Sequence, residues 1–207
     1  MSDLMFFTNP MSRGRIVRMM LEEVGADYST TLLDYGNMRT PGYLAINPMA
    51  KVPAIVHRGT VVTEAAAICA YLADAFPDAG LAPPPSDRGA YYRWIFFGAG
   101  PVEAAVTNAS LKVDTSDPQI RGRVGYGDLA SVLDTLDGLL ADGRTWLLGE
   151  VFSAVDVYLG SQVVWGLMFG TIEKRPAFED YASRLQNRPA VQRATAMDDA
   201  LMPPQGG

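Results

Sequence analysis

The stretch that decides the fold is Asn47-Pro-Met-Ala-Lys-Val-Pro-Ala54, which continues into the apolar residues Ile55 and Val56. We expect a strand over Val52–Val56, because proline is tolerated at the start of a strand although not in the interior of a central one. Arg58-Gly59 then indicates a tight turn into Thr60-Val-Val62. Together these segments predict a β-hairpin.

The residues on either side of the hairpin predict alternating strands and helices. Upstream, the apolar run Leu4–Thr8 ends at Asn9-Pro10 and predicts a buried strand followed by a turn. Ser12 is a candidate N-cap for a helix that ends at Gly25, and Tyr28–Leu33 predicts a second strand. A helical face follows the hairpin and contains Ala65, Ile68, Cys69, Leu72 and Phe76. The order β-α-β, loop, β-β-α predicts an α/β layer.

Beyond this layer the strand signals stop. Asp78–Asp87 carries three consecutive prolines and is typical of a linker. Helical periodicity then returns in five segments, at about 88–108, 120–141, 154–168, 177–186 and 190–201. Ser153 and Asp156 form a capping box at the start of the third segment. We therefore expect an α/β domain over 1–77, a linker over 78–87 and an all-α domain over 88–207.

Composition excludes several classes of function. The 207 residues include 17 basic and 23 acidic ones, for a net charge of −6, and no basic run suggests nucleic-acid binding. The single Cys69 excludes an intrachain disulfide, and with the single His57 it excludes a multi-His or Cys/His metal site. We expect His57 to be a structural or surface residue. No apolar window is long enough for a membrane span, and a reducing cytoplasmic setting fits best.

Four local motifs resemble those of the cytosolic glutathione transferases, in the right order and across both halves of the chain. They are the segments Asn47–Ala54, Thr63–Ile68, Leu148–Asp156 and Thr8–Arg13. The resemblance implies a thioredoxin-like N-terminal domain and an all-α C-terminal domain, in a protein that is usually dimeric. It also implies that glutathione is the co-substrate. The resemblance is to the bacterial, serine-type members.

The resemblance also implies a glutathione site. In the family the bond before Pro53 is cis, and Val52 offers its main-chain N–H and C=O to the cysteinyl unit of glutathione. Glu64 corresponds to the acid that meets the γ-glutamyl amino group. Ala65 stands where a serine usually binds the γ-glutamyl carboxylate, so only the N–H of that position remains. Lys51 matches a contact to the glycine carboxylate.

Ser12 is the candidate catalytic residue. A free thiol has a pKa of about 8.5, and a hydroxyl at a helix start can stabilise the reactive thiolate. Thr8, Asn9 or N–H groups of the first helix are alternative donors. Phe6 and Phe7 stand where a catalytic tyrosine is expected, and Cys69 lies inside the third predicted helix, which disfavours the tyrosine- and cysteine-type members.

We expect the second substrate to lie between the two halves, where small-molecule sites are common. Candidate walls of this hydrophobic electrophile site are Met11, Tyr91, Trp94 and Trp165. We expect conjugation of glutathione to the electrophile, with a glutathione-dependent isomerase, a dehalogenase or a non-enzymatic binding or stress protein as alternatives. An apolar helix around Tyr91–Phe97 is the expected contact of a homodimer.

Overall fold

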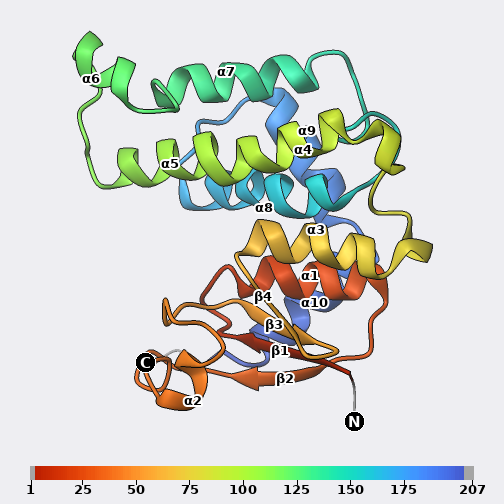
Figure 1. Ribbon diagram of the computed structural model, residues 1–207. Coiled ribbons are helices and arrows are strands. Elements are labelled where there is room, and N and C mark those ends of the chain that lie inside the picture. The colour runs from red at the N-terminus through yellow and green to blue at the C-terminus, as the bar shows by residue number, and fades with distance from the viewer. Residues whose placement is uncertain (1–2, 203–207) are drawn as a thin grey trace. The chain divides into compact units, whose positions relative to one another are not determined.

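The computed structural model describes residues 3–202, and its parts are drawn in Figure 1. Two compact units can be distinguished: one holds the chain up to Leu81 together with the segment from Arg188 onward, and the other holds Ala82–Asn187. The outermost residues of the expected ranges 1–77 and 88–207 lie outside the described part of the chain.

The first unit is built on a four-stranded mixed sheet. The strand order is β2-β1-β3-β4, with β1 and β2 parallel and the other pairs antiparallel. Its strands are β1 (Leu4–Thr8), β2 (Ser29–Leu32), β3 (Ala54–His57) and β4 (Thr60–Thr63). Its helices are α1 (Gly14–Val24), α2 (Pro41–Leu44), α3 (Ala65–Ala75) and α10 (Pro189–Asp199), with a short η1 turn (Pro77–Ala79). This is the thioredoxin-like arrangement that the resemblance implied.

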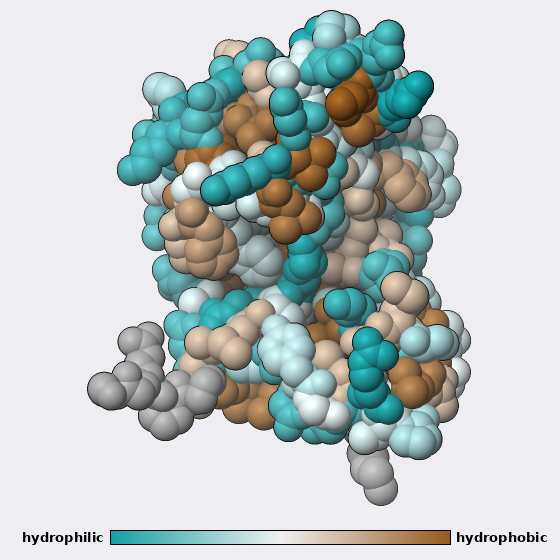
Figure 2. Space-filling model, turned by 90° about the vertical axis from the view of Figure 1, so that its left-hand side faces the viewer, coloured by the Kyte–Doolittle hydropathy of each residue, from teal (hydrophilic) through white to brown (hydrophobic). Residues whose placement is uncertain are grey.

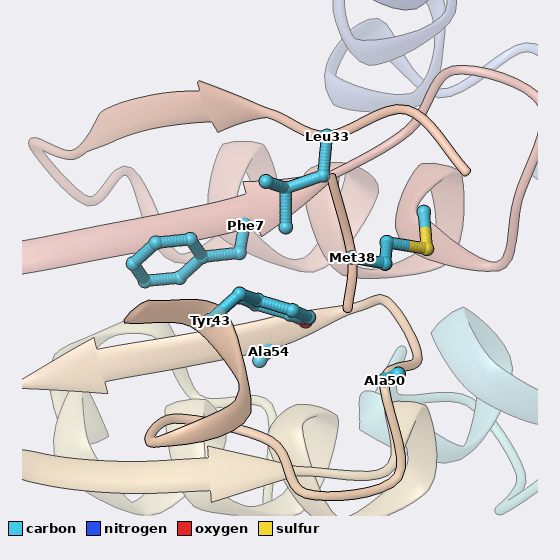
Figure 3. Close-up of a cluster of buried hydrophobic side chains, with 6 residues drawn as sticks. All are labelled: Phe7, Leu33, Met38, Tyr43, Ala50 and Ala54. Carbon is cyan, nitrogen blue, oxygen red and sulfur yellow. The ribbon is translucent and has the colours of Figure 1, made fainter. Parts of the chain in front are cut away.

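Helices cover both faces of the sheet. Successive side chains of β1 point to opposite faces, so Phe6 and Phe7 pack against different helices. In Figure 1, α1, α3 and α10 lie on one side of the sheet and α2 on the other. Phe6 packs its ring 6.1 Å from that of Tyr28, with the guanidinium group of Arg18 5.2 Å from its centre. Phe7 instead contacts Tyr43 of α2, at 5.7 Å between ring centres. Figure 3 shows the buried cluster on this second face, formed by Phe7, Leu33, Met38, Tyr43, Ala50 and Ala54.

The last helix packs on α1, which differs from its expected place in the all-α domain. The buried pair Arg18–Asp198 joins the two helices, with 2.7 Å between Nε and Oδ1. Arg188 donates two hydrogen bonds to the carboxylate of Glu23, at 2.6 and 2.7 Å. Sequence periodicity predicted a helix here, but its packing on α1 involves pairs of residues far apart in the sequence, which the periodicity does not reveal.

The second unit is helical. Its elements are η2 (Pro85–Asp87), α4 (Gly89–Phe97), the π-helical turn η3 (Gly98–Val102), α5 (Glu103–Ser110), α6 (Pro118–Arg123), α7 (Leu129–Leu140), α8 (Ala154–Phe169) and α9 (Pro176–Gln186). The expected segment 120–141 is two helices, because Gly127 adopts a positive φ of 71° and Asp128 caps a new helix at Ser131 N. The predicted capping box of Ser153 and Asp156 is confirmed at the start of α8.

Candidate functional site

The strand register brings three segments to one end of the sheet in the first unit. Phe7 near the end of β1 pairs with Ala54 at the start of β3, and Ala54 pairs with Thr63 at the end of β4. The residues after β1, before β3 and after β4 therefore emerge at the same end. These residues include Ser12, the segment Lys51–Pro53, and Glu64 with Ala65.

The segment before β3 has the geometry that the resemblance implied. The Val52–Pro53 peptide bond is cis. Pro53 is buried, Val52 is half-buried and Lys51 is exposed. Within residues 3–202, no hydrogen bond of the Val52 main chain is found. Its N–H and C=O are thus available to a ligand.

The segment after β4 forms the N-terminus of α3. Glu64 is the N-cap residue, with φ 66° and ψ 118°, and its side chain is exposed and makes no capping hydrogen bond. Positive φ is uncommon for a residue with a side chain. The buried Ala65 begins the helix, whose first N–H groups can bind a carboxylate.

The segment after β1 is a turn held by the side chain of Asn9. Its Nδ2 donates to Leu33 O at 2.8 Å, and its Oδ1 accepts from Met11 N at 2.9 Å. Arg15 Nε donates to Pro10 O at 2.5 Å, and Arg15 Nη2 lies 2.8 Å from Asp199 Oδ1. These bonds connect the loop to Leu33, to its own main chain and, through Arg15, to Asp199.

Ser12 is half-buried, and its hydroxyl makes two hydrogen bonds inside the turn. It donates to Asn9 O at 2.7 Å and accepts from Gly14 N at 3.0 Å. The predicted N-cap position is wrong by one residue, because Arg13 occupies it without a side-chain capping bond. Ser12 nevertheless pairs the first N–H of α1.

The alternative side-chain donors are poorly placed for a ligand. Thr8 is fully buried, and its hydroxyl faces Gly14 so closely that a Cβ at position 14 would overlap it. Both ends of the Asn9 amide are engaged in the turn. Cys69 is fully buried, and burial raises the pKa of its thiol, so it is unsuited to nucleophilic chemistry.

The candidate electrophile residues are distributed over both units. Met11 of the first unit is 54% exposed. In the second unit, Tyr91 and Trp94 are buried, whereas Trp165 is half-buried. Tyr91 and Trp94 have the burial of core residues, and their role as walls stays a prediction.

The sequence predicted no functional role for two residues near the site, although one of them, Asn47, opens the motif Asn47–Ala54. Tyr43 and Asn47 both donate hydrogen bonds to Lys51 O, at 2.5 and 2.8 Å. The available signal was the tripeptide Asn-Pro-Met, which occurs at 9–11 and again at 47–49.

Two further properties bear on the class of site. No group of three or more possible metal-ligating side chains occurs within the described part of the chain. None of the helices between residues 3 and 202 has the length and apolar character needed to cross a membrane.

Known proteins resemble this chain in sequence and structure. The family model of the glutathione S-transferase N-terminal domain matches residues 11–75. Glutathione S-transferase GST-4.5 of Xanthomonas campestris is 30% identical over 149 residues, which cover 67% of this chain and 70% of the relative. Maleylacetoacetate isomerase of Pseudomonas aeruginosa is 29% identical, covering 86% of this chain and 88% of the relative.

A solved structure supports the same assignment. A sphingomonad glutathione S-transferase, crystallised with glutathione, superposes with a TM-score of 0.76 at 29% identity, over 94% of this chain and 98% of that one. Sequence and fold agree over most of the chain, and it therefore belongs to the glutathione S-transferase family.

Proposed function

We propose that the first unit binds glutathione at the end of the sheet where the three segments meet, and that the protein transfers the thiol to a hydrophobic electrophile. The observation that carries the proposal is this convergence of Ser12, Val52 and Glu64, fixed by the register of β1, β3 and β4. Glutathione is a co-substrate in this proposal.

The available groups fit the parts of the tripeptide. The unpaired main chain of Val52 suits the cysteinyl unit, which would pair with it as an added strand does. The exposed carboxylate of Glu64 suits the γ-glutamyl ammonium group, and the N–H of Ala65 suits the neighbouring carboxylate. The exposed ammonium group of Lys51 suits the glycine carboxylate.

Ser12 would activate the thiol by donating a hydrogen bond to the thiolate. This requires its proton to turn from Asn9 O toward the sulfur while Gly14 N–H still holds Oγ in place. Asn9 O would remain paired, because it also accepts from Ser12 N at 3.1 Å. The thiol proton leaves to solvent, and the thiolate attacks the electrophilic carbon; as the C–S bond forms, the leaving group departs with its electron pair, as chloride from 1-chloro-2,4-dinitrobenzene.

Binding and turnover must be tested separately. We expect calorimetry to detect binding of glutathione, and we expect an assay with 1-chloro-2,4-dinitrobenzene to detect conjugation. Binding without turnover on any electrophile would favour the non-enzymatic alternative. Failure to bind glutathione would refute the proposed site.

The isomerase alternative has a specific observation in its favour, the 29% identity to maleylacetoacetate isomerase. The two reactions differ in stoichiometry: conjugation consumes one glutathione per turnover, whereas a glutathione-dependent isomerase regenerates it. We would therefore supply maleylacetoacetate with catalytic glutathione. Complete conversion would identify an isomerase.

We also propose a homodimer that uses α4, in a cytoplasmic setting. Tyr92 and Phe96 lie one turn apart on this helix and are 47% and 68% exposed. Figure 2 shows apolar side chains exposed among polar ones on the face it presents. Light scattering should give twice the monomer mass, and Phe96→Glu should reduce it to the monomer value.

A further inference from the structure

The peptide group between Lys51 and Val52 is held from one side by two donors. Tyr43 Oη donates to Lys51 O at 2.5 Å, and Asn47 Nδ2 donates to the same oxygen at 2.8 Å. A carbonyl oxygen has two lone pairs, so both can be used at once. The orientation of this peptide plane is thus fixed by two bonds.

Both donors are buried and are held by further contacts. Tyr43 is 4% exposed and packs on Phe7 within the cluster of Figure 3. Asn47 is 2% exposed; its Oδ1 accepts from Met49 N at 3.0 Å, and its N donates to Tyr43 O at 2.8 Å. Burial raises the pKa of Tyr43 to about 12, so its hydroxyl keeps its proton near neutral pH.

The opposite edge of the same peptide group carries the N–H of Val52. The bond between Lys51 and Val52 is trans, since the cis bond found among the described residues follows Val52. In a trans peptide the C=O and N–H point in opposite directions. The Val52 N–H therefore points away from Tyr43 and Asn47. Hydrogen bonds at the carbonyl also polarise the amide and strengthen its N–H as a donor.

We propose that Tyr43 and Asn47 are positioning residues for glutathione, which hold the Lys51–Val52 peptide so that the Val52 N–H meets the cysteinyl carbonyl. This inference rests on the proposed glutathione site. It assigns part of the affinity to two buried side chains that touch no ligand atom. They act on the cysteinyl unit of the ligand and not on its γ-glutamyl end.

Tyr43→Phe tests this role, because it removes one donor and keeps the ring that packs on Phe7. We would measure binding of glutathione and of γ-glutamylcysteamine, which has the thiol but lacks both the cysteinyl carbonyl and the glycine attached to it. The variant should bind glutathione about threefold to tenfold more weakly, as expected for one hydrogen bond. Its affinity for γ-glutamylcysteamine should change less than about twofold, giving a coupling between residue and ligand group.

Steady-state kinetics provide a second measurement. KM for glutathione should rise in Tyr43→Phe while kcat and the pH profile of the thiol stay unchanged, because Ser12 is untouched. Tyr28→Phe is the matched control, since its half-buried hydroxyl bonds Arg18 and Glu22 and not the loop before Val52. It should leave both affinities at the wild-type level.

Two results would overturn the inference, and they are distinguishable. Equal weakening of both ligands by Tyr43→Phe would show a general loss of structure and reject the positioning role alone. Failure of the wild-type protein to bind either ligand would reject the glutathione site and the positioning role together.

Discussion

The tripeptide Asn-Pro-Met forms two turns of the same design at the same end of the sheet. In both, the asparagine Oδ1 accepts from the methionine N, at 2.9 Å for Asn9 and 3.0 Å for Asn47. In both, the asparagine O accepts from the N–H three residues on, at 3.1 Å from Ser12 and 2.9 Å from Ala50. Each Nδ2 donates to a carbonyl at 2.8 Å, that of Leu33 or that of Lys51.

The turns differ in their fourth residue and in the segment after it. The first ends at Ser12, which places a hydroxyl before α1. The second ends at Ala50, with a φ of 54° and a buried methyl group, and leads into the extended segment before Val52. The asparagine therefore supplies the rigid frame in both cases. At the fourth position, the first turn carries the hydroxyl of Ser12, and the second carries only the methyl group of Ala50.

The largest effect is expected from removing the asparagine side chain that holds each turn. Asn9→Ala removes the donor to the buried carbonyl of Leu33, and no second donor to that oxygen is found within residues 3–202. We expect a loss of about 2–4 kcal/mol in stability, because Met11 N also loses its acceptor. Asn47→Ala should cost about 1–2 kcal/mol, since Lys51 O keeps Tyr43 as a donor.

Adding Tyr43→Phe to Asn47→Ala should raise its loss of stability to about that of Asn9→Ala. Lys51 O then loses both donors, and the double variant should exceed the sum of the single variants by about 1 kcal/mol. Hydrogen exchange of first-unit amides should provide the measurement, since all three tryptophans lie in the second unit. Additive losses would show that the two donors act independently.

The sequence predicted those parts of the fold that local patterns determine. The Arg58-Gly59 turn and the capping box of Ser153 each act over a few residues, and the hairpin and the start of α8 formed as expected. The strand expected over Val52–Val56 instead begins at Ala54, after the cis bond between Val52 and Pro53. The placement of α10 was not predicted. It involves the pair Arg18–Asp198, whose members are 180 residues apart, and a local pattern does not show that they meet.

The candidate site could be outlined from the sequence, because its segments are marked by short local motifs. The resemblance to the family implied Val52 and Glu64, and the position of Ser12 at a helix start suggested its role; the sheet register brings their segments to one end. The hydrogen bonds from Tyr43 and Asn47 depend on how the loop closes on itself. The direction of the Ser12 hydroxyl depends on the turn at Asn9, which a capping pattern does not specify.

The second-largest effect is expected from a substitution that makes the fourth residues of the two turns alike. Ser12→Ala converts the first turn to Asn-Pro-Met-Ala, the sequence of the second. If Ser12 stabilises the thiolate, the apparent pKa of conjugation should rise by about one unit, and activity near neutral pH should fall about tenfold. Activity should recover above the new pKa. A pH profile of kcat/KM for glutathione measures both changes.

Two variants separate this chemistry from local stability. Ser12→Gly also removes the hydroxyl, both as the acceptor for Gly14 N and as the donor to the thiolate. It should therefore shift the pH profile as Ser12→Ala does. Ala50→Ser places a hydroxyl at the fourth position of the other turn and should leave the profile unchanged. A wild-type profile in Ser12→Gly would show that the serine serves the turn and not the thiol.

The smallest expected effect concerns the far end of β3, where neither turn contributes. His57 is buried, its Nδ1 lies 3.0 Å from the Tyr71 hydroxyl, and its ring stacks on Phe76. Burial, assisted by the charge of Arg58 and opposed by Asp3, lowers the pKa of His57 in the folded protein.

Below about pH 6.5 the unfolded chain therefore binds a proton that the folded chain does not. Stability should be constant above this pH and fall below it until the folded protein also binds the proton, by no more than about 1.4 kcal/mol at pH 5.5. As His57 is the single histidine of the sequence, His57→Gln should abolish most of this slope in first-unit hydrogen exchange while leaving glutathione affinity unchanged. A slope that persists in the variant would place the titrating group elsewhere, among the carboxylates.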